Sequence, residues 1–218
     1  MKTIKQFICL FSLVLLMMAG SNSLVYSQAN DKPKDTNLDK QVKAFLKERE
    51  NSWRDLNVPT SDGQALYDII VKNNYKQAVE IGTSTGHSGI WIAWALSKTG
   101  GKLTTFEIDE DRHKEAMENF KKAGLSQFID ARLGDAHELV PQVKGPVDFV
   151  FSDADKSWYI NYFNDLDSKL SVGGCFVSHN VSKTNNQRFY EYVIKLPNYK
   201  TTLDDRGAGM SISYKTGK

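Results

Sequence analysis

Cysteine is scarce in this sequence, since Cys9 and Cys175 are the only two among 218 residues. Cys9 lies in an apolar N-terminal stretch, and removal of that stretch would leave Cys175 alone. No intrachain disulfide could then stabilise the rest of the chain. Cys175 sits in an apolar, strand-like segment, so we expect a buried thiol rather than a nucleophile.

An excess of charge of either sign is also missing. The chain has 28 lysine and arginine residues against 26 aspartate and glutamate residues. Residues 1–29 contain Lys2 and Lys5 and no acid, so residues 30–218 carry 28 − 2 = 26 basic and 26 acidic side chains. A formally neutral domain without a basic stripe argues against a nucleic-acid partner.

The longest hydrophobic run is short. It covers residues 7–19 and follows Lys2 and Lys5, whereas a membrane-spanning helix needs ~20 apolar residues. A basic start, a short apolar core and the small residues Ser27 and Ala29 are typical of a secretory signal peptide cleaved after Ala29. We therefore expect residues 1–29 to direct export, to the periplasm or out of the cell. Two alternatives are an uncleaved N-terminal membrane anchor and a soluble cytoplasmic form.

The remaining residues suffice for one domain with a substantial core. Residues 30–37 are polar around Pro33 and predict a linker, and residues 38–218 predict the domain. Helical spacing of apolar residues and short apolar or alternating runs predict its elements. Expected helices span residues 38–46, 62–73, 88–96, 110–122, 136–139, 159–170 and 187–196, and expected strands span 78–81, 103–108, 129–133, 147–152, 175–179, 199–203 and 210–214.

The order of these elements predicts the fold class. Strands and helices alternate over residues 78–179, which favours a mostly parallel sheet covered by helices on both faces. The last two strands flank a Gly/Asp turn and predict an antiparallel hairpin at the sheet edge. We expect a Rossmann-like, doubly wound α/β domain, with Gly124 and Gly173-Gly174 ending helices.

A glycine-bearing turn follows the first expected strand. Residues 80–88 read Glu-Ile-Gly-Thr-Ser-Thr-Gly-His-Ser and lead directly into an apolar helix. Nucleotide-like ligands bind at the carboxyl end of such a strand, where glycine lets the backbone approach the ligand. The Glu-x-Gly-x-x-x-Gly spacing departs from the Gly-x-Gly-x-x-Gly pattern of dinucleotide-binding proteins. His87 is expected to pack near this site rather than to act in catalysis.

Acidic residues follow the next three strands as well. Glu107 ends the second strand, where an acid can accept hydrogen bonds from ribose hydroxyls. Gly134-Asp135-Ala136 follows the third strand, and Asp153-Ala154-Asp155-Lys156 follows the fourth. Each acid alone has a structural interpretation as a helix cap. Together, at consecutive strand ends, they predict one ligand site.

These segments resemble the cation-dependent class I S-adenosylmethionine O-methyltransferases, the group of catechol and caffeoyl-CoA O-methyltransferases. The resemblance runs from about Val58 to the C-terminus. It rests on residues 79–88 (VEIGTSTGHS), 106–109 (FEID), 134–136 (GDA), 153–156 (DADK) with Tyr159 and Tyr162, and 173–180 (GGCFVSHN). Asp-Ala-Asp-Lys followed by tyrosines is the most specific of these segments.

The resemblance implies a role for each matched residue. Glu107 would bind the ribose of S-adenosylmethionine, and Lys156 would be the general base, with Asp153 beside it in catalysis. A divalent metal would be held by Asp153, His179 and Asn180. The cofactor-binding residues implied are Val58, Glu80, Gly82, Thr83, Ser84, Ser88, Glu107, Ala136, Asp153 and Asp155.

His179 departs from the family pattern, because the family has an aspartate at this position. Magnesium favours oxygen ligands in octahedral geometry, whereas imidazole suits zinc, iron, nickel and copper. Three interpretations stay open for His179. It is a ligand of a transition metal, or a base or substrate contact beside a weak or absent metal site, or a structural histidine at a strand end. The expected metal is accordingly magnesium, manganese or a transition metal.

The resemblance predicts methyl transfer from S-adenosylmethionine to a hydroxyl of a small, aromatic, catechol-like acceptor. No membrane partner is expected beyond the N-terminal segment, and a homodimer is expected only by analogy with the family. An NAD-dependent oxidoreductase is one alternative, disfavoured by the glycine spacing and by Asp-Ala-Asp-Lys. A non-catalytic or metal-independent S-adenosylmethionine-binding envelope protein is the other, favoured by His179 and by the export signal.

Overall fold

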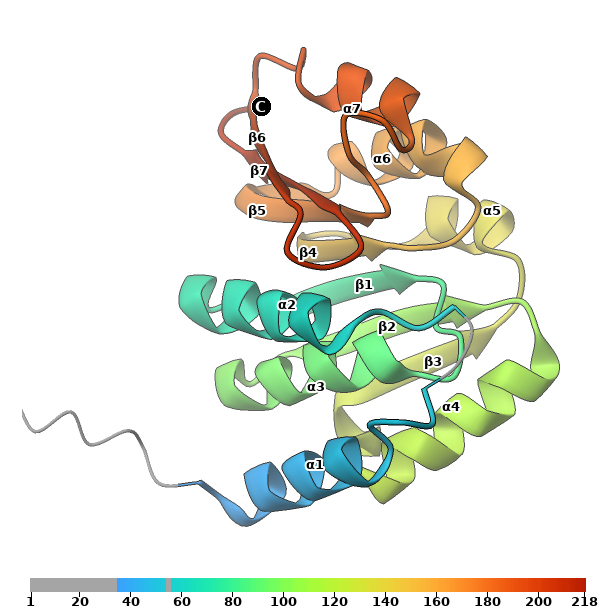
Figure 1. Ribbon diagram of the computed structural model, residues 1–218. Helices are drawn as coiled ribbons and strands as arrows, with labels where there is room; N and C mark the ends of the chain where they lie inside the picture. Colours follow the sequence, from blue (N-terminus) through green and yellow to red (C-terminus); the bar gives the residue numbers. More distant parts are fainter. Residues whose placement is uncertain (1–34, 54–55) are drawn as a thin grey trace, which may run out of the picture. The chain divides into compact units, whose positions relative to one another are not determined.

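One sheet runs through the computed structural model, which describes residues 35–53 and 56–218 (Figure 1). The predicted signal peptide or anchor, residues 1–29, lies outside the described residues, as does most of the predicted linker. Within the described residues, seven strands pair in the order β3-β2-β1-β4-β5-β7-β6. Their bounds are β1 Gln77–Ile81, β2 Lys102–Glu107, β3 Ile129–Leu133, β4 Val147–Ser152, β5 Leu170–His179, β6 Tyr199–Asp204 and β7 Met210–Lys215.

Strand direction and register bring the ends of β1, β2 and β4 to one edge of the sheet. β1 pairs in parallel with both β2 and β4, and Ile81 lies opposite Phe106 and Ser152. The residue after each of these three is Gly82, Glu107 or Asp153, so all three residues lie at the same edge. β7 is antiparallel to β5 and to β6. The predicted fold class, a mostly parallel sheet with a C-terminal antiparallel hairpin, is confirmed.

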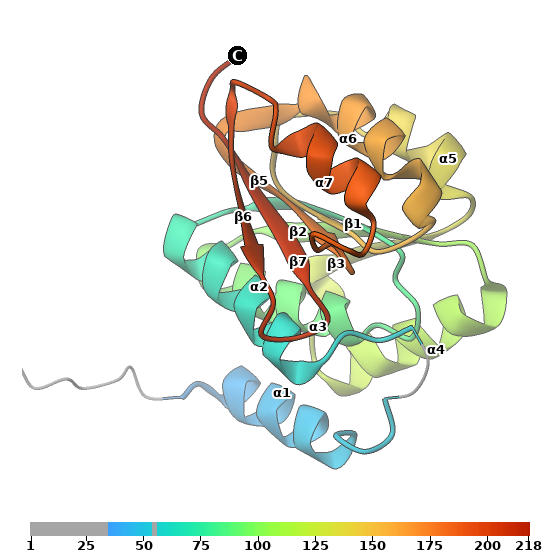
Figure 2. The same cartoon turned by 45° about the horizontal axis from the view of Figure 1, so that its top comes forward.

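Helices cover both faces of the sheet (Figure 2). Along β1, Val79 and Ile81 pack in a core cluster with residues of α6 and α7, while Ala78 packs in a second cluster with residues of α2 and α3. This alternation follows from the two-residue repeat of a strand. The helices are α1 Asn37–Glu48, α2 Thr60–Asn73, α3 His87–Thr99, α4 Glu110–Lys122, α5 Ala136–Leu139, α6 Tyr159–Asp167 and α7 Gln187–Val193, with short 3-10 turns η1 Ser126–Phe128, η2 Val140–Gln142 and η3 Lys156–Trp158.

A buried acid fastens α1 to the rest of the domain. Thr36 caps α1 in a capping box with Asp39, which satisfies backbone donors at the start of the helix. Asp39 also accepts a hydrogen bond from Nε1 of Trp94 at 2.7 Å and forms an ion pair with Lys98, both on α3. The first helix is therefore held by polar contacts as well as by its apolar face.

The C-terminal part of the sheet differs from the sequence prediction at one point. Gly173 and Gly174 do not end a helix, because α6 ends at Asp167 and β5 already begins at Leu170. The carbonyl of Gly173 accepts a hydrogen bond from the hydroxyl of Tyr75 at 2.6 Å. A Cβ atom on Gly174 would lie 2.9 Å from the carbonyl oxygen of Asp148. Glycine here permits close strand packing, which a helix-stop rule does not detect.

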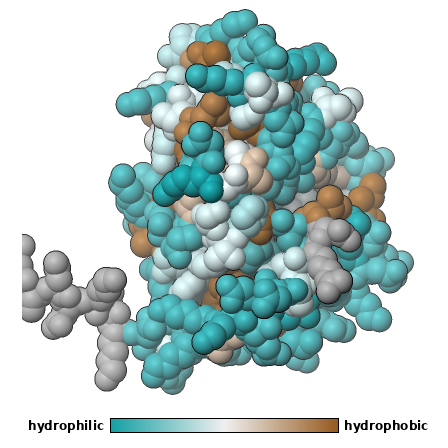
Figure 3. All heavy atoms as spheres, viewed as in Figure 1, coloured by the Kyte–Doolittle hydropathy of each residue, from teal (hydrophilic) through white to brown (hydrophobic). Residues whose placement is uncertain are grey.

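The surface carries few large apolar areas in the view of Figure 3, where hydrophilic residues predominate and hydrophobic ones form small separate patches. Among residues 35–53 and 56–218, no helix has the length and apolar character needed to cross a membrane.

Candidate active site

A cavity of about 560 Å³ opens at the carboxyl ends of β1, β2, β4 and β5. This is the edge at which ligands bind in open α/β sheets. Predicted site residues from each of these strand ends border it. The residues that line the cavity are Leu56, Asn57, Pro59, Gly82, Ser84, Glu107, Ile108, Arg112, Asp153, Ala154, Asp155, Lys156, His179, Asn180 and Ala208.

Gly82 brings two segments of backbone together at this edge. Its φ is +97°, and a Cβ atom there would lie 3.1 Å from the carbonyl carbon and oxygen of Asp153. Its amide donates a hydrogen bond to the carbonyl of Phe106 at 3.1 Å. A side chain at Gly82 would both strain the backbone and push Asp153 away. Glycine at this position therefore allows the backbone after β1 and the backbone after β4 to lie close together beside the cavity.

A buried polar network supports the glycine turn from below. The hydroxyl of Thr105 donates to Oε2 of Glu80 at 2.6 Å, and it lies 2.5 Å from the hydroxyl of Thr83. Glu80 is 0% exposed. Burial raises the pKa of its carboxyl to about 7, against the lowering effect of hydrogen bonds from Ser88 and Thr105. Glu80 therefore releases its proton at a much higher pH than an ordinary glutamate does.

The raised pKa of Glu80 predicts a pH-dependent stability. Its carboxyl has a pKa of about 7 in the folded protein against an ordinary value of 4.5. The stability that Glu80 contributes is thus complete below about pH 4.5 and is lost as the pH rises through about 7, by up to about 3 kcal/mol. Urea unfolding should show wild type losing stability relative to Glu80→Gln across this window. A constant difference between the two proteins from pH 4.5 to 8 would contradict the assignment.

Glu107 presents its carboxylate at the end of β2. Oε2 accepts a hydrogen bond from the amide of Ser84 at 2.6 Å, and Oε1 accepts from the amides of Ile108 and Asp109 at 3.1 and 3.0 Å. The residue is 7% exposed and borders the cavity. These amides fix the carboxylate in place, and its oxygens can accept further hydrogen bonds from a ligand.

A smaller cavity of about 180 Å³ adjoins this carboxylate. It shares Gly82, Glu107, Ile108, Ala154 and Asp155 with the larger cavity, and adds Phe106, Gly134, Asp135, Ala136, His137 and Tyr162. On the Ala136 side its walls combine the backbone of Gly134 and Ala136 with the polar side chains of Asp135 and His137. The predicted cofactor residues Ala136 and Asp155 therefore lie beside Glu107, as parts of one continuous lining.

His137 is a member of this lining that the sequence did not single out. Its Nδ1 lies 2.7 Å from Oδ1 of Asp135 and its Nε2 lies 3.0 Å from Oδ2 of Asp155. The His137 ring stacks on the ring of Tyr162, with a centroid distance of 5.7 Å, and forms a T-shaped contact with Trp158, with a centroid distance of 4.8 Å. The sequence signal that could have identified His137 was its position directly after the Gly-Asp-Ala segment.

The polar end of the larger cavity gathers four predicted residues, and Asp62, which was not predicted, contacts one of them. Nζ of Lys156 lies 3.3 Å from Oδ1 of Asp153, and Nδ1 of His179 lies 3.1 Å from Oδ2 of the same carboxylate. Nε2 of His179 lies 2.9 Å from Oδ2 of Asp62 on α2. The sequence placed Asp62 only at a helix start, and no motif marks its contact with His179. Asn180, the third predicted metal ligand, borders the cavity next to His179.

Opposing charges set the electrostatics of this cluster. Burial alone would lower the pKa of His179, but Asp153 and Asp62 together raise it to about 9. Burial would raise the pKa of Asp62, yet the hydrogen bonds from His179 and from the amide of Ala208 hold it below its ordinary value. The space around the His179 ring therefore favours positive charge.

Four predicted cofactor residues lie behind the cavity wall. Val58, Glu80, Thr83 and Ser88 are buried, and they are not among the residues that line either cavity. The carbonyl of Val58 accepts a hydrogen bond from Nδ1 of His87 at 2.9 Å. Val58 thereby ties the segment that borders the cavity to the start of α3.

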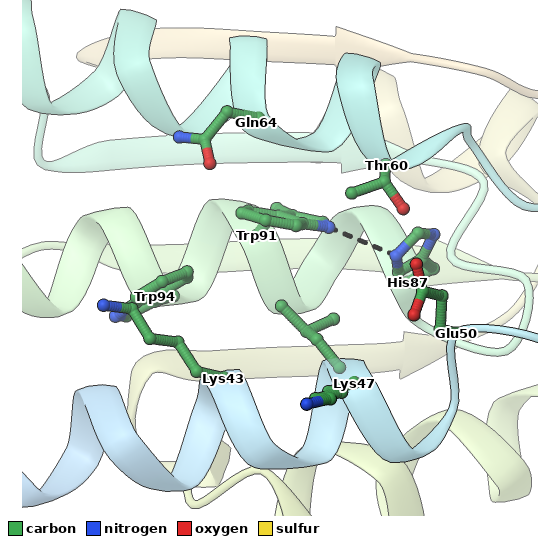
Figure 4. Close-up of a pocket in the computed structure, with 9 residues that line it drawn as sticks. Lys43, Lys47, Glu50, Thr60, Gln64, His87, Trp91 and Trp94 are labelled. Carbon is green, nitrogen blue, oxygen red and sulfur yellow. Dashed lines mark hydrogen bonds between the residues drawn. The ribbon is translucent and has the colours of Figure 1, made fainter.

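His87 belongs to a separate cavity of about 270 Å³ between α1, α2 and α3 (Figure 4). Its Nε2 accepts a hydrogen bond from Nε1 of Trp91 at 3.2 Å, and Trp53 stacks on its ring at 4.5 Å. Burial lowers the pKa of His87 to about 4. With both ring nitrogens bonded, the neutral ring serves to hold the loop and the helix together.

Within residues 35–53 and 56–218, no group of three or more histidine, cysteine, aspartate and glutamate side chains is arranged to hold a metal ion. Asp153 and His179 supply two such side chains. A third ligand at this point would have to come from another residue type, such as the amide of Asn180.

Known proteins resemble this chain in sequence and in fold. A family model described as O-methyltransferase matches residues 29–186. A catechol O-methyltransferase of Niastella koreensis is 37% identical over 130 residues, covering 58% of this chain and 58% of that protein. Caffeoyl-CoA O-methyltransferase 1 of Eucalyptus globulus is 33% identical over 127 residues, covering 56% of this chain and 51% of that protein. The chain thus matches between about half and two thirds of the length of such curated relatives.

A solved structure shares the fold. The O-methyltransferase of Bacillus cereus, in complex with SAH, superimposes with a TM-score of 0.70 at 24% sequence identity. The superposition covers 84% of this chain and 92% of that one. At this level of identity the likeness establishes the architecture of the chain.

Proposed function

This chain belongs to the O-methyltransferase family, and we propose that it transfers a methyl group from S-adenosylmethionine to a hydroxyl of a small, aromatic, catechol-like acceptor. The observation that carries the proposal is the larger cavity at the strand ends. It brings Gly82, Glu107, Asp153 and Lys156 together from three strands of the sheet. The names of the relatives, catechol and caffeoyl-CoA O-methyltransferase, support the acceptor class.

The residues around the cavity fit the methyl donor. Two adjoining spaces of about 560 and 180 Å³ share Glu107, whose carboxylate is anchored by three backbone amides. A ribose beside Glu107 would leave the adenine near Ala136 and the methionine end near Gly82 and Ser84. When bound, S-adenosylmethionine supplies a methyl group activated by a positive sulfonium.

The residues at the polar end also fit a divalent ion. Nδ1 of His179 is buried and has no hydrogen-bond partner among the described residues, and it lies 3.1 Å from Oδ2 of Asp153. Both atoms can donate electron pairs into the same space, which the Asn180 amide borders. We propose Asp153, His179 and Asn180 as the residues that hold the ion. When bound, such an ion stabilises a phenolate by direct contact with its oxygen.

Lys156 and Asp153 would then act on the acceptor hydroxyl. A phenol has a pKa of about 10, so ionising it at pH 7 costs roughly 4 kcal/mol. Nζ of Lys156, at the mouth of the cavity, would take the hydroxyl proton, and Asp153 keeps this amine in place through its 3.3 Å contact. Fixing the acceptor beside the donor supplies much of the remaining acceleration.

The test is methyl transfer by the full-length protein, followed by mass spectrometry of the acceptor. We expect mono-methylated catechol, with phenol methylated at least about 10-fold more slowly because it offers one oxygen in place of two. NAD in place of S-adenosylmethionine should give no turnover of either compound. Failure to methylate any of a panel of catechols, by protein that binds S-adenosylhomocysteine, would favour the alternative of a non-catalytic binding protein.

A further inference from the structure

The ring of His179 is enclosed by carboxylates on both sides. It reaches from the end of β5 to Asp153 after β4 and to Asp62 in the first turn of α2. The side chains of His179 and Asp62 are 5% and 3% exposed, respectively. Such a buried histidine has its orientation fixed by its neighbours rather than by solvent.

The two ring nitrogens differ in their surroundings. Nε2 forms a hydrogen bond with Oδ2 of Asp62 at 2.9 Å, which assigns a proton to this nitrogen. Nδ1 lies at ion-pair distance from Asp153, 3.1 Å, but outside hydrogen-bond geometry. Metal-bound histidines have this arrangement, in which one nitrogen donates to a carboxylate and the other faces the ion.

Asp62 is itself held from the hairpin. Its Oδ2 accepts a hydrogen bond from the amide of Ala208 at 3.0 Å. A Cβ atom on Gly207 would overlap Oδ1 of Asp62, so the turn between β6 and β7 closes tightly over this carboxylate. The C-terminal hairpin therefore fixes Asp62, and Asp62 fixes the ring of His179.

We propose that Asp62 is a positioning residue that turns Nδ1 of His179 toward Asp153, and that the resulting nitrogen-containing site prefers a transition-metal ion over magnesium. This inference rests on the metal site of the proposed function. Magnesium favours oxygen ligands, and one of the three proposed ligands here is an imidazole. Divalent cobalt, nickel and zinc accept nitrogen ligands readily. The site would bind such an ion through one nitrogen and two oxygens of the protein.

The experiment is a cobalt titration of the full-length, tag-free protein after removal of metals with a chelator. Cobalt is the probe because its visible absorption reports ligand type without any turnover. We expect one equivalent to bind, at least about 10-fold more tightly than magnesium in competition. Binding of cobalt no tighter than magnesium, or no cobalt absorption at all, would overturn the proposal and leave His179 as a charged bridge between two carboxylates.

Variants then separate Asp62 from the ligands. Asp62→Asn should weaken cobalt binding by about 10- to 100-fold, and His179→Asp should reduce the preference for cobalt over magnesium. His137→Gln is the matched control, because His137 also lies between two carboxylates and its loss should leave the cobalt absorption unchanged. Unchanged cobalt affinity in a folded Asp62→Asn protein would contradict the positioning role.

The titration is independent of methyl transfer. Cobalt binding as expected, in protein that methylates no catechol, would remove the proposed function and retain the metal preference. Cobalt binding no tighter than magnesium, in protein that methylates catechol, would do the reverse.

Discussion

Replacing Glu107 with alanine is expected to weaken binding of S-adenosylhomocysteine by at least about 100-fold. A carboxylate that accepts two ribose hydroxyls contributes about 1.5–3 kcal/mol for each hydrogen bond, and each 1.4 kcal/mol is a factor of about ten in affinity. Removal of Glu107 also frees the amide of Ser84, which now donates to Oε2 at 2.6 Å. Calorimetric titration of the full-length variant measures the loss directly.

A nearby acid provides the control for this variant. Glu110 lies three residues further on, exposed on the first turn of α4, and it is not among the residues that line either cavity. Glu110→Ala should retain affinity within about twofold, which separates the contact at Glu107 from a general change of charge. If the Glu107→Ala protein keeps its fold and its affinity, the ribose does not lie at Glu107.

Replacing Lys156 with methionine is expected to lower kcat by about 10²- to 10⁴-fold, the range for loss of a general base. Affinity for S-adenosylhomocysteine should change by less than about threefold, because the amine reaches Asp153 and the acceptor end of the cavity. Steady-state kinetics with catechol measure kcat, and calorimetry measures the affinity for S-adenosylhomocysteine. Lys183→Met, on an exposed turn, is the matched control.

An acidic acceptor distinguishes a base from a structural residue. Nitrocatechol ionises at lower pH than catechol, so its methylation depends less on a general base. The kcat ratio of wild type to Lys156→Met should therefore shrink markedly with nitrocatechol. An equal loss with both acceptors would mean that Lys156 positions the acceptor without taking its proton.

Local patterns predicted most of the fold. Apolar spacing located α4 at residues 110–122, and short apolar runs located β3 and β4 at 129–133 and 147–152, with the bounds that the structure has. The buried residues of α4 lie on one helix face, including Ala116 and Phe120, and β4 is buried along almost its whole length, so both leave a pattern in the sequence. The start of β5 was missed because Gly173 and Gly174 permit contacts with Tyr75 and Asp148, and those contacts come from other parts of the chain.

The candidate site was predictable where strand ends supply it. Glu107 and Asp153 follow strands whose order in the sheet brings them together, so their proximity follows from the topology. Asp62 was not predictable in this way. It meets His179 across 117 positions of sequence, and an acid in the first turn of a helix has an ordinary interpretation as a favourable charge at the helix start. Only the packing of the end of β5 against the first turn of α2 reveals the contact with His179.

Binding of S-adenosylhomocysteine to the full-length protein tests the central claim most directly. Calorimetry should detect one site with micromolar affinity, and an excess of NAD should leave that affinity unchanged. Micromolar binding, lost in the Glu107→Ala variant, would establish that the strand-end cavity holds the product of methyl transfer. No heat of binding, from protein with a cooperative unfolding transition, would contradict the account and mean that the fold no longer binds its cofactor.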